Sequence, residues 1–218
     1  MKLQFHQVVG KSEVHEAEYD GGEVYSNCND GPTYAPLVCA LGDHVMRSGK
    51  HYVTFKRVGM SLMLPPASVS VGVIRPIDLS KADLAVGETE EEKFLPWDEK
   101  HYPSLADNNW TEGWGEDGKV DYCLYQTNGG LCFYGYWKNP SPAEDDETLK
   151  DWPGKDHISY GEECGLLLDL DEGTLAVYKA GKRLGIMKEG LTGEYSWFVM
   201  VEGTGLRMER GDVPVVEA

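Results

Sequence analysis

The chain has 218 residues, 41% of them hydrophobic, and a formal net charge of −17. This length suits one large β domain and lets the chain bury enough surface to fold without a disulfide or metal staple. A protein with this acidic net charge repels a phosphate backbone, and the sequence contains no extended cluster of basic residues. We therefore expect no nucleic-acid ligand. The 26 Gly and 11 Pro are spread along the chain and indicate many turns between short strands.

The cysteines and histidines indicate neither a disulfide framework nor a metal site. The cysteines are odd in number and form no C-x-x-C pair; they are Cys28, Cys39, Cys123, Cys132 and Cys164. The six histidines share no metal-ligand spacing. We therefore expect no metal and no cofactor.

The N-terminal residues lack the apolar run of a signal peptide, and no stretch of the sequence is apolar enough to span a bilayer. From these features we expect an intracellular, cytoplasmic protein that is a monomer and does not bind membranes.

Apolar residues alternate with a period of two along most of the chain, which predicts strands rather than helices. In 68–74 the side chains of Val69, Val71 and Val73 point one way. Residues 122–126 and 131–136 flank Asn128-Gly129, a strong hairpin signal because both residues accept positive φ. These segments predict the first antiparallel strands.

Four further strands follow in the C-terminal third. An apolar run over 165–170 ends at an Asp-Glu-Gly turn at 171–173, and residues 175–179 and 183–187 flank Ala180-Gly181. In 196–202, Trp197 and Val199 lie on one face, with Phe198 on the other, as expected of a strand between two packed layers. Consecutive hairpins predict antiparallel sheets.

Two acidic, turn-rich segments interrupt the strands, at about 81–114 and 140–156. Both are expected to be surface insertions of one domain covering 1–218, with one short helix at about 79–85. Each is too short to form a second domain.

Three segments resemble, in order and spacing, the motifs of the SPRY (B30.2/SPRY) family. They are the Met-Arg-Ser-Gly-Lys-His-Tyr run at 46–52, the Ser-Val-Gly-Val run at 70–73, and the apolar strand, Asp-x-Asp-x-Gly-x-Leu turn and Leu-Gly pair within 160–185. Two positions depart from the family pattern: Val53 stands where Trp is usual, and Ala180 where Asn is usual. The resemblance covers about 38–211.

The resemblance implies an all-β fold with two antiparallel sheets, a concanavalin A-like jelly-roll sandwich with long surface loops. The segment 1–37 would pack on this core as extra strands. The resemblance also implies a protein-interaction module that binds a short peptide or loop of a partner through loops at one edge. The net charge favours a basic partner.

The resemblance places the partner surface in the loops after 69–73 and after Val201. The insertion at 81–114 adds tryptophans that could anchor a ligand. The candidate partner-binding residues are Arg75, Pro76, Trp97, Trp110, Glu202, Gly203 and Thr204.

Three other functions would each need a particular set of residues: calcium binding, carbohydrate binding and glycoside hydrolysis. A calcium loop starting at Asp169 would need a bidentate Glu where Ala180 stands. A carbohydrate-binding, lectin-like sandwich would use a cluster such as Asp107, Asn108, Asn109 and Trp110. A glycoside hydrolase would need paired carboxylates in a cleft. No catalytic motif is present, so we expect a binding module rather than an enzyme.

Overall fold

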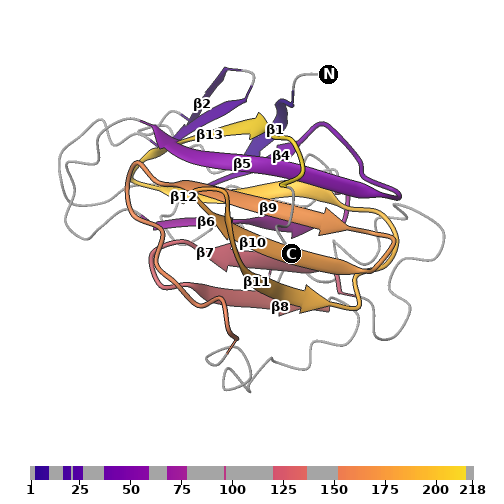
Figure 1. The fold of residues 1–218 in the computed structure, drawn as a ribbon. Helices are drawn as coiled ribbons and strands as arrows, with labels where there is room; N and C mark the ends of the chain where they lie inside the picture. Colours follow the sequence, from indigo (N-terminus) through magenta and orange to yellow (C-terminus); the bar gives the residue numbers. More distant parts are fainter. Residues whose placement is uncertain are drawn as a thin grey trace.

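The structure, a computed structural model, describes residues 3–9, 17–20, 22–26, 37–58, 68–77, 96, 120–136 and 152–214. Their regular elements are all strands, arranged in two antiparallel sheets (Figure 1). None of these residues lies in a helix long and apolar enough to cross a membrane. The predicted all-β sandwich is confirmed, whereas the predicted helix at about 79–85 lies outside the described residues.

The smaller sheet has six strands in the order β1-β4-β12-β6-β7-β8. Their bounds are Phe5–Val9 (β1), Leu37–Gly42 (β4), Ser196–Glu202 (β12), Ser68–Ile74 (β6), Tyr122–Gln126 (β7) and Leu131–Gly135 (β8).

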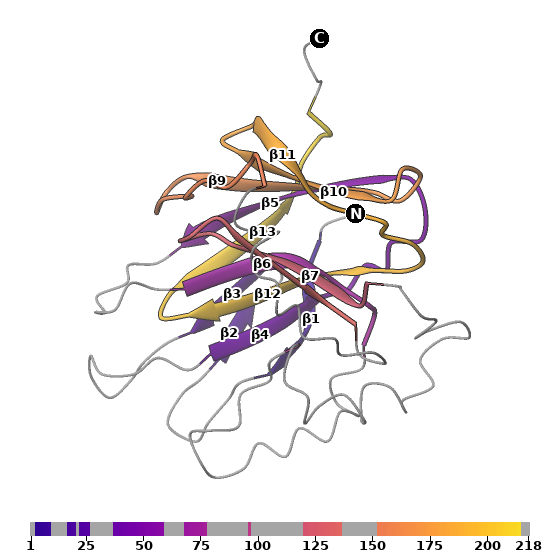
Figure 2. The ribbon, with the colours of Figure 1, turned by 90° about the horizontal axis from the view of Figure 1, so that it is seen from below.

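The larger sheet has seven strands in the order β11-β10-β9-β5-β13-β3-β2. Their bounds are Lys182–Glu189 (β11), Thr174–Lys179 (β10), Glu163–Asp169 (β9), Lys50–Val58 (β5), Gly205–Arg210 (β13), Glu23–Ser26 (β3) and Ala17–Asp20 (β2). Figure 2 shows the two sheets as stacked layers, with β9 and β10 in one and β6 and β7 in the other.

The core fills the space between the sheets with the inward residues of each strand. Val71 and Trp197 come from the smaller sheet, while Phe55 and Leu166 come from the larger one, and all four are almost fully buried. The rings of Phe55 and Trp197 meet edge to face, with centres 6.4 Å apart. The alternation read from the sequence therefore identifies the core-facing side of these strands.

The outer face of the smaller sheet carries a second apolar cluster. Phe198 and Met200 alternate with the core residues of β12 and pack with Leu41, Ile74 and Leu124. β12 is thus apolar on both faces, as the sequence predicts, and it lies at the centre of its sheet between β4 and β6.

The turn between β7 and β8 covers residues 127–130, which is the gap left by the predicted strands 122–126 and 131–136. Its positive φ falls on Gly130 (65°), however, rather than on Asn128 and Gly129. Thr127 leaves the β7–β8 ladder because its N–H and its hydroxyl both donate to the carbonyl of Val69 in β6, at 2.9 and 3.1 Å. This attachment fixes the start of the turn to a third strand, and the positive φ then falls at its last residue.

The other two hairpins form where the sequence predicts them. The turn after β9 is closed by Asp169, whose Oδ1 accepts the N–H groups of Asp171 and Glu172, both at 3.2 Å. This arrangement is an Asx-type turn rather than a calcium loop. In the β10–β11 turn Ala180 has φ 49° and Gly181 φ 79°, so Ala180 takes the left-handed conformation that Asn tolerates better.

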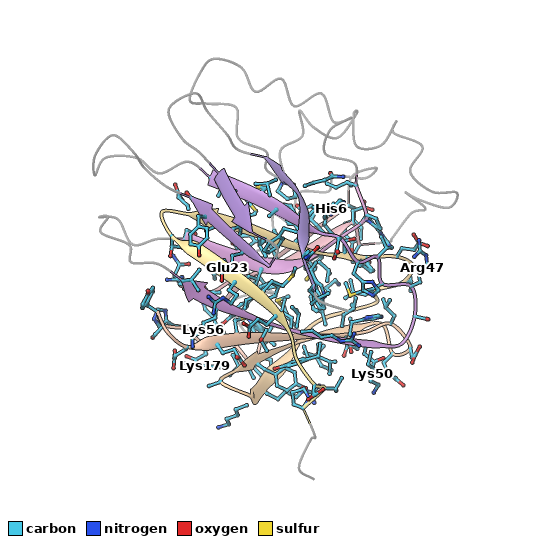
Figure 3. All side chains as sticks on the ribbon, turned by 90° about the horizontal axis from the view of Figure 1, so that it is seen from above. His6, Glu23, Arg47, Lys50, Lys56 and Lys179 are labelled. Atoms are coloured by element: carbon cyan, nitrogen blue, oxygen red, sulfur yellow. The ribbon has the colours of Figure 1, made fainter. Side chains whose placement is uncertain are left out.

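The antiparallel register divides the sandwich into two ends. Ile74 lies opposite Ser196, and Ser68 lies opposite Glu202. We call the first end, with the loops around Arg75, 44–49, 171–173 and 190–195, the Arg75 end. The other, with the loops around 127–130, 156–162, 180–181 and 203–204, is the Lys179 end. In Figure 3, Lys56 and Lys179 lie at one end of the molecule, and Arg47 and Lys50 lie at the other.

Strand β11 forms one edge of the larger sheet. Its pairing with β10 is interrupted by two register shifts, between Leu175 and Ala176 and between Val177 and Tyr178. Lys182 and Arg183 are exposed at its start.

Candidate binding surface

Arg75 points into the protein rather than toward solvent. Its side chain is 4% exposed and follows β6 at the Arg75 end. The guanidinium donates to the carbonyls of Thr192 and Glu194, at 2.6 and 3.2 Å, and lies 3.7 Å from a carboxylate oxygen of Asp121. It also stacks over the ring of Tyr195, 4.3 Å from its centre. Arg75 therefore holds the loop before β12 in place.

The two loops predicted to form one partner surface lie at opposite ends of the sandwich. Pro76 lies beside Arg75, whereas Glu202 ends β12 and Gly203 and Thr204 form the turn to β13 at the Lys179 end. The N–H of Gly203 donates to Ser26 Oγ (3.1 Å), and Thr204 is buried. Because β6 and β12 are antiparallel over seven paired residues, the two predicted loops do not form one surface.

Several predicted positions lie outside the described residues. They are Trp97 and Trp110, the cluster 107–110, and all of the two acidic insertions except Pro96 and residues 152–156. At the end of the second insertion Trp152 is buried and donates its Nε1–H to the carbonyl of Gly130 at 3.0 Å.

A loop over residues 156–162 crosses the Lys179 end from one sheet to the other. At its start the N–H of Ile158 donates to the carbonyl of Thr127 at 2.8 Å, and the Tyr125 hydroxyl donates to the carbonyl of Asp156. At its end it runs directly into β9 of the larger sheet. We call residues 156–162 the bridging loop.

Lys179, the last residue of β10, holds this loop in place through a hydrogen bond and two ion pairs. Its ammonium group donates to the carbonyl of His157 (2.6 Å) and lies 3.1 Å from Asp156 Oδ2 and 3.5 Å from Glu162 Oε2. The hydrogen bond from Lys179 lowers the pKa of Asp156 and raises that of the ammonium group. The N–H of Ser159 lowers the pKa of Glu162. The loop is thus fixed by both charge and hydrogen bonds.

The bridging loop carries an exposed aromatic side chain, Tyr160. It is 56% exposed, and the only other large hydrophobic residue that the structure describes as exposed is Val213 (41%). Tyrosine offers a large amphipathic contact area at little cost in side-chain entropy and is frequent among interface hot spots.

Arg57 extends from β5 toward the other sheet at the Lys179 end, where it contacts Thr127, the residue to which the bridging loop is also bonded. Val53, Phe55 and Arg57 alternate along β5, and the first two belong to the core. The guanidinium of Arg57 is half-buried and donates to the hydroxyl of Thr127 in the other sheet at 2.8 Å. In the part of the chain that the structure describes it makes no ion pair with a carboxylate.

Cysteine and metal chemistry find no support in the described part of the chain. Cys39, Cys123, Cys132 and Cys164 are buried and free, and burial raises the pKa of Cys39 and Cys164 well above the ordinary thiol range. Such thiols are poor nucleophiles. Within the described residues no group of His, Cys, Asp and Glu side chains is placed to hold a metal ion.

Arg57, Tyr160 and Lys179 of this surface were not predicted from the sequence. The sequence did contain a signal for Arg57. Every second residue of a strand faces the same side, and the other core-facing residues of β5 are apolar, so a charged residue at position 57 stands out. Tyr160 and Lys179 carry no such signal, since their roles depend on where the bridging loop crosses the end of the sandwich.

Comparison with known proteins identifies the fold. No family model matches the chain, and no curated protein matches its sequence. Among solved structures, the SPRY domain of human HERC1 superimposes with a TM-score of 0.52, covering 92% of this chain and 95% of that domain, at 14% identity. The fold is that of a SPRY domain. The PSpry domain of TRIM65 covers 97% of this chain and 93% of that one, with a TM-score of 0.47 and 14% identity.

The SPRY fold agrees with the resemblance read from the sequence and places its motifs. The Ser-Gly-Lys-His-Tyr run enters β5, the Ser-Val-Gly-Val run lies in β6, and the Asp-x-Asp-x-Gly turn joins β9 to β10. Val53, where the family usually has Trp, is fully buried in the core.

Proposed function

We propose that this chain is a protein-interaction module that binds a peptide or loop of a partner protein through the Lys179 end of its SPRY fold. The observation that carries the proposal is Tyr160, a widely exposed aromatic side chain on a loop that Lys179 holds in place. A rigid loop with an aromatic anchor loses little entropy on binding. The neighbouring turn at Glu202, Gly203 and Thr204 would extend the surface.

Among the described residues, two ion pairs join neighbouring strands: Lys50 with Asp169 (3.0 Å) and Arg207 with Glu23 (2.5 Å). The net charge of −17 would speed association with a basic partner at low salt.

An affinity pull-down from the source cell, followed by mass spectrometry, would find the partner. Binding would then be measured by calorimetry for the wild type, Tyr160→Ala and Val213→Ala. We expect Tyr160→Ala to weaken binding about tenfold or more, the effect of a hot-spot aromatic residue. Val213→Ala is a matched control that removes the other exposed hydrophobic side chain, and we expect less than about a twofold change.

Equal affinities of the wild type and Tyr160→Ala would show that the partner does not use the bridging loop. The thermal unfolding midpoint of each variant should match that of the wild type, because both side chains are exposed and carry little of the stability.

A further inference from the structure

Arg57 differs from the four cations that hold the described strands and loops together through carboxylates. The sequence has 37 acidic and 20 basic residues, so carboxylates are abundant. Arg75, Lys50, Lys179 and Arg207 each lie within 4.0 Å of one. Arg57 is half-buried, yet its guanidinium donates to the hydroxyl of Thr127 and pairs with no described carboxylate.

Only part of the hydrogen-bonding capacity of the half-buried Arg57 guanidinium is used within the described residues, and its other donors can reach solvent. The group has five N–H donors, and one of them reaches Thr127 Oγ1. Burial lowers the pKa of Arg57, which reflects the loss of water around the charge. A carboxylate could take the remaining donors in a bidentate pair and offset that loss.

A second unsatisfied group lies next to this site in the chain. The side-chain oxygen Oδ1 of Asn128 is buried and accepts no hydrogen bond within the described structure. Asn128 follows Thr127, the residue that Arg57 contacts, and its carbonyl faces Nδ1 of His157 at 3.4 Å in the bridging loop. The Oδ1 atom is closed off from solvent, so the polar group that can face a partner here is the Arg57 guanidinium, and a carboxylate side chain suits its donors.

We propose that Arg57 is the receptor for an Asp or Glu side chain of the partner, with Thr127 and Asn128 beside it. This inference rests on the proposed function and names one contact of the same surface. It is compatible with a partner that is basic overall, because long-range attraction follows net charge and this contact follows local geometry.

The test uses small carboxylate probes and the full chain. NMR would follow the Nε–Hε signals of the arginine side chains, with that of Arg57 assigned from the Arg57→Lys spectrum. Three probes would be titrated at constant ionic strength: the N-methylamide of N-acetylaspartate (a side-chain carboxylate), the N-methylamide of N-acetylasparagine (its neutral isostere) and N-acetylalanine (a C-terminal carboxylate).

We expect a saturable shift of the Arg57 signal with the aspartate probe and none with the asparagine probe. The exposed Arg183 at the same end is the internal control and should not saturate. No shift at Arg57, or equal shifts at Arg57 and Arg183, would overturn the proposal. A stronger response to N-acetylalanine would overturn the side-chain assignment and indicate a C-terminal carboxylate.

The partner found by pull-down gives the second readout. Arg57→Ala should weaken its binding roughly tenfold to a hundredfold, as expected for a lost hydrogen bond to a charged group. Lys56→Ala, the adjacent exposed cation of β5, should change it less than about twofold. If Tyr160→Ala weakens binding and Arg57→Ala does not, this inference fails while the proposed function stands. If neither does, the proposed surface itself is wrong.

Discussion

The guanidinium of Arg75 lies 4.3 Å from the centre of the Tyr195 ring, and the Tyr195 hydroxyl donates to the carbonyl of Val120 at 2.7 Å. These contacts connect the end of β6, the segment before β7 and the loop before β12. Three parts of the smaller sheet that are distant in sequence are thereby joined through two side chains at the Arg75 end.

Removing Arg75 should therefore destabilise the fold. Arg75→Ala would leave the buried carboxylate of Asp121 without this cation and the carbonyls of Thr192 and Glu194 without their donor. We expect the free energy of unfolding to fall by about 3–5 kcal/mol, measured by urea denaturation. Arg47→Ala, which removes an exposed cation of the same end, should cost less than about 1 kcal/mol. Similar losses in both variants would contradict the structural role of Arg75.

Ala180 is strained, and relieving the strain should stabilise the protein. It is the only non-glycine residue with positive φ in the described part of the chain. Asn and Gly tolerate this conformation, so we expect Ala180→Asn to raise the free energy of unfolding by about 0.5–1 kcal/mol. Ala180→Val is the opposite test, because a β-branched side chain suits positive φ least and should lower stability. A thermal melt that ranks Val above Asn would contradict this prediction.

The ion pairs between Lys179 and the bridging loop should weaken in acid. The pKa values of Asp156 and Glu162 are lowered, so their pairing with Lys179 stabilises the folded state above their ordinary pKa values, 3.8 and 4.5. The stabilisation is lost as the pH falls through the lowered values. The Lys179 pKa is raised, so its own contribution is complete below 10.5 and is lost only at higher pH.

Lys179→Met should accordingly melt at a lower temperature than the wild type at pH 7, and the difference should shrink as the pH falls below about 3.8. Lys182→Met, which removes an exposed cation across the same hairpin, serves as the control. If the melting temperatures of the wild type and Lys179→Met differ by the same amount at pH 7 and pH 2.5, Lys179 acts through its packing rather than its charge.

The buried thiols should resist modification until the protein unfolds. Cys123 and Cys132 approach to 3.9 Å between their sulfur atoms and remain unbonded thiols. Burial raises the pKa of Cys123 well above the ordinary thiol range, which leaves little reactive thiolate. In a Cys28→Ser background we expect labelling by a thiol reagent to follow the urea unfolding curve. Rapid labelling without denaturant would contradict this expectation.

Most strands could be predicted from the sequence because their signal is local. The alternation over 68–74 and 196–202 coincides with β6 and β12, and the burial of Trp197 is confirmed. The position of Arg75 could not be predicted in this way. Its orientation depends on Tyr195, which is 120 residues away in the chain and is brought near by the pairing of β6 with β12.

The binding surface was harder to predict for a related reason. A loop can be identified from its turn residues, but the end of the sandwich at which it lies depends on the direction and register of its strand. The turn at 127–130 shows the same dependence. Asn-Gly predicts positive φ at both of its residues, whereas the turn attached through Thr127 to Val69 in a third strand has it at Gly130.

The edge strand β11 also bears on how copies of this chain behave at high concentration. An unpaired sheet edge can recruit a strand from another molecule and begin aggregation. The register shifts along β11 and the exposed charges of Lys182 and Arg183 oppose such a pairing, by interrupting the row of free backbone groups and by repelling the same charges on a second copy. Within the described residues, this edge therefore combines two features that lower the tendency of the sandwich to polymerise.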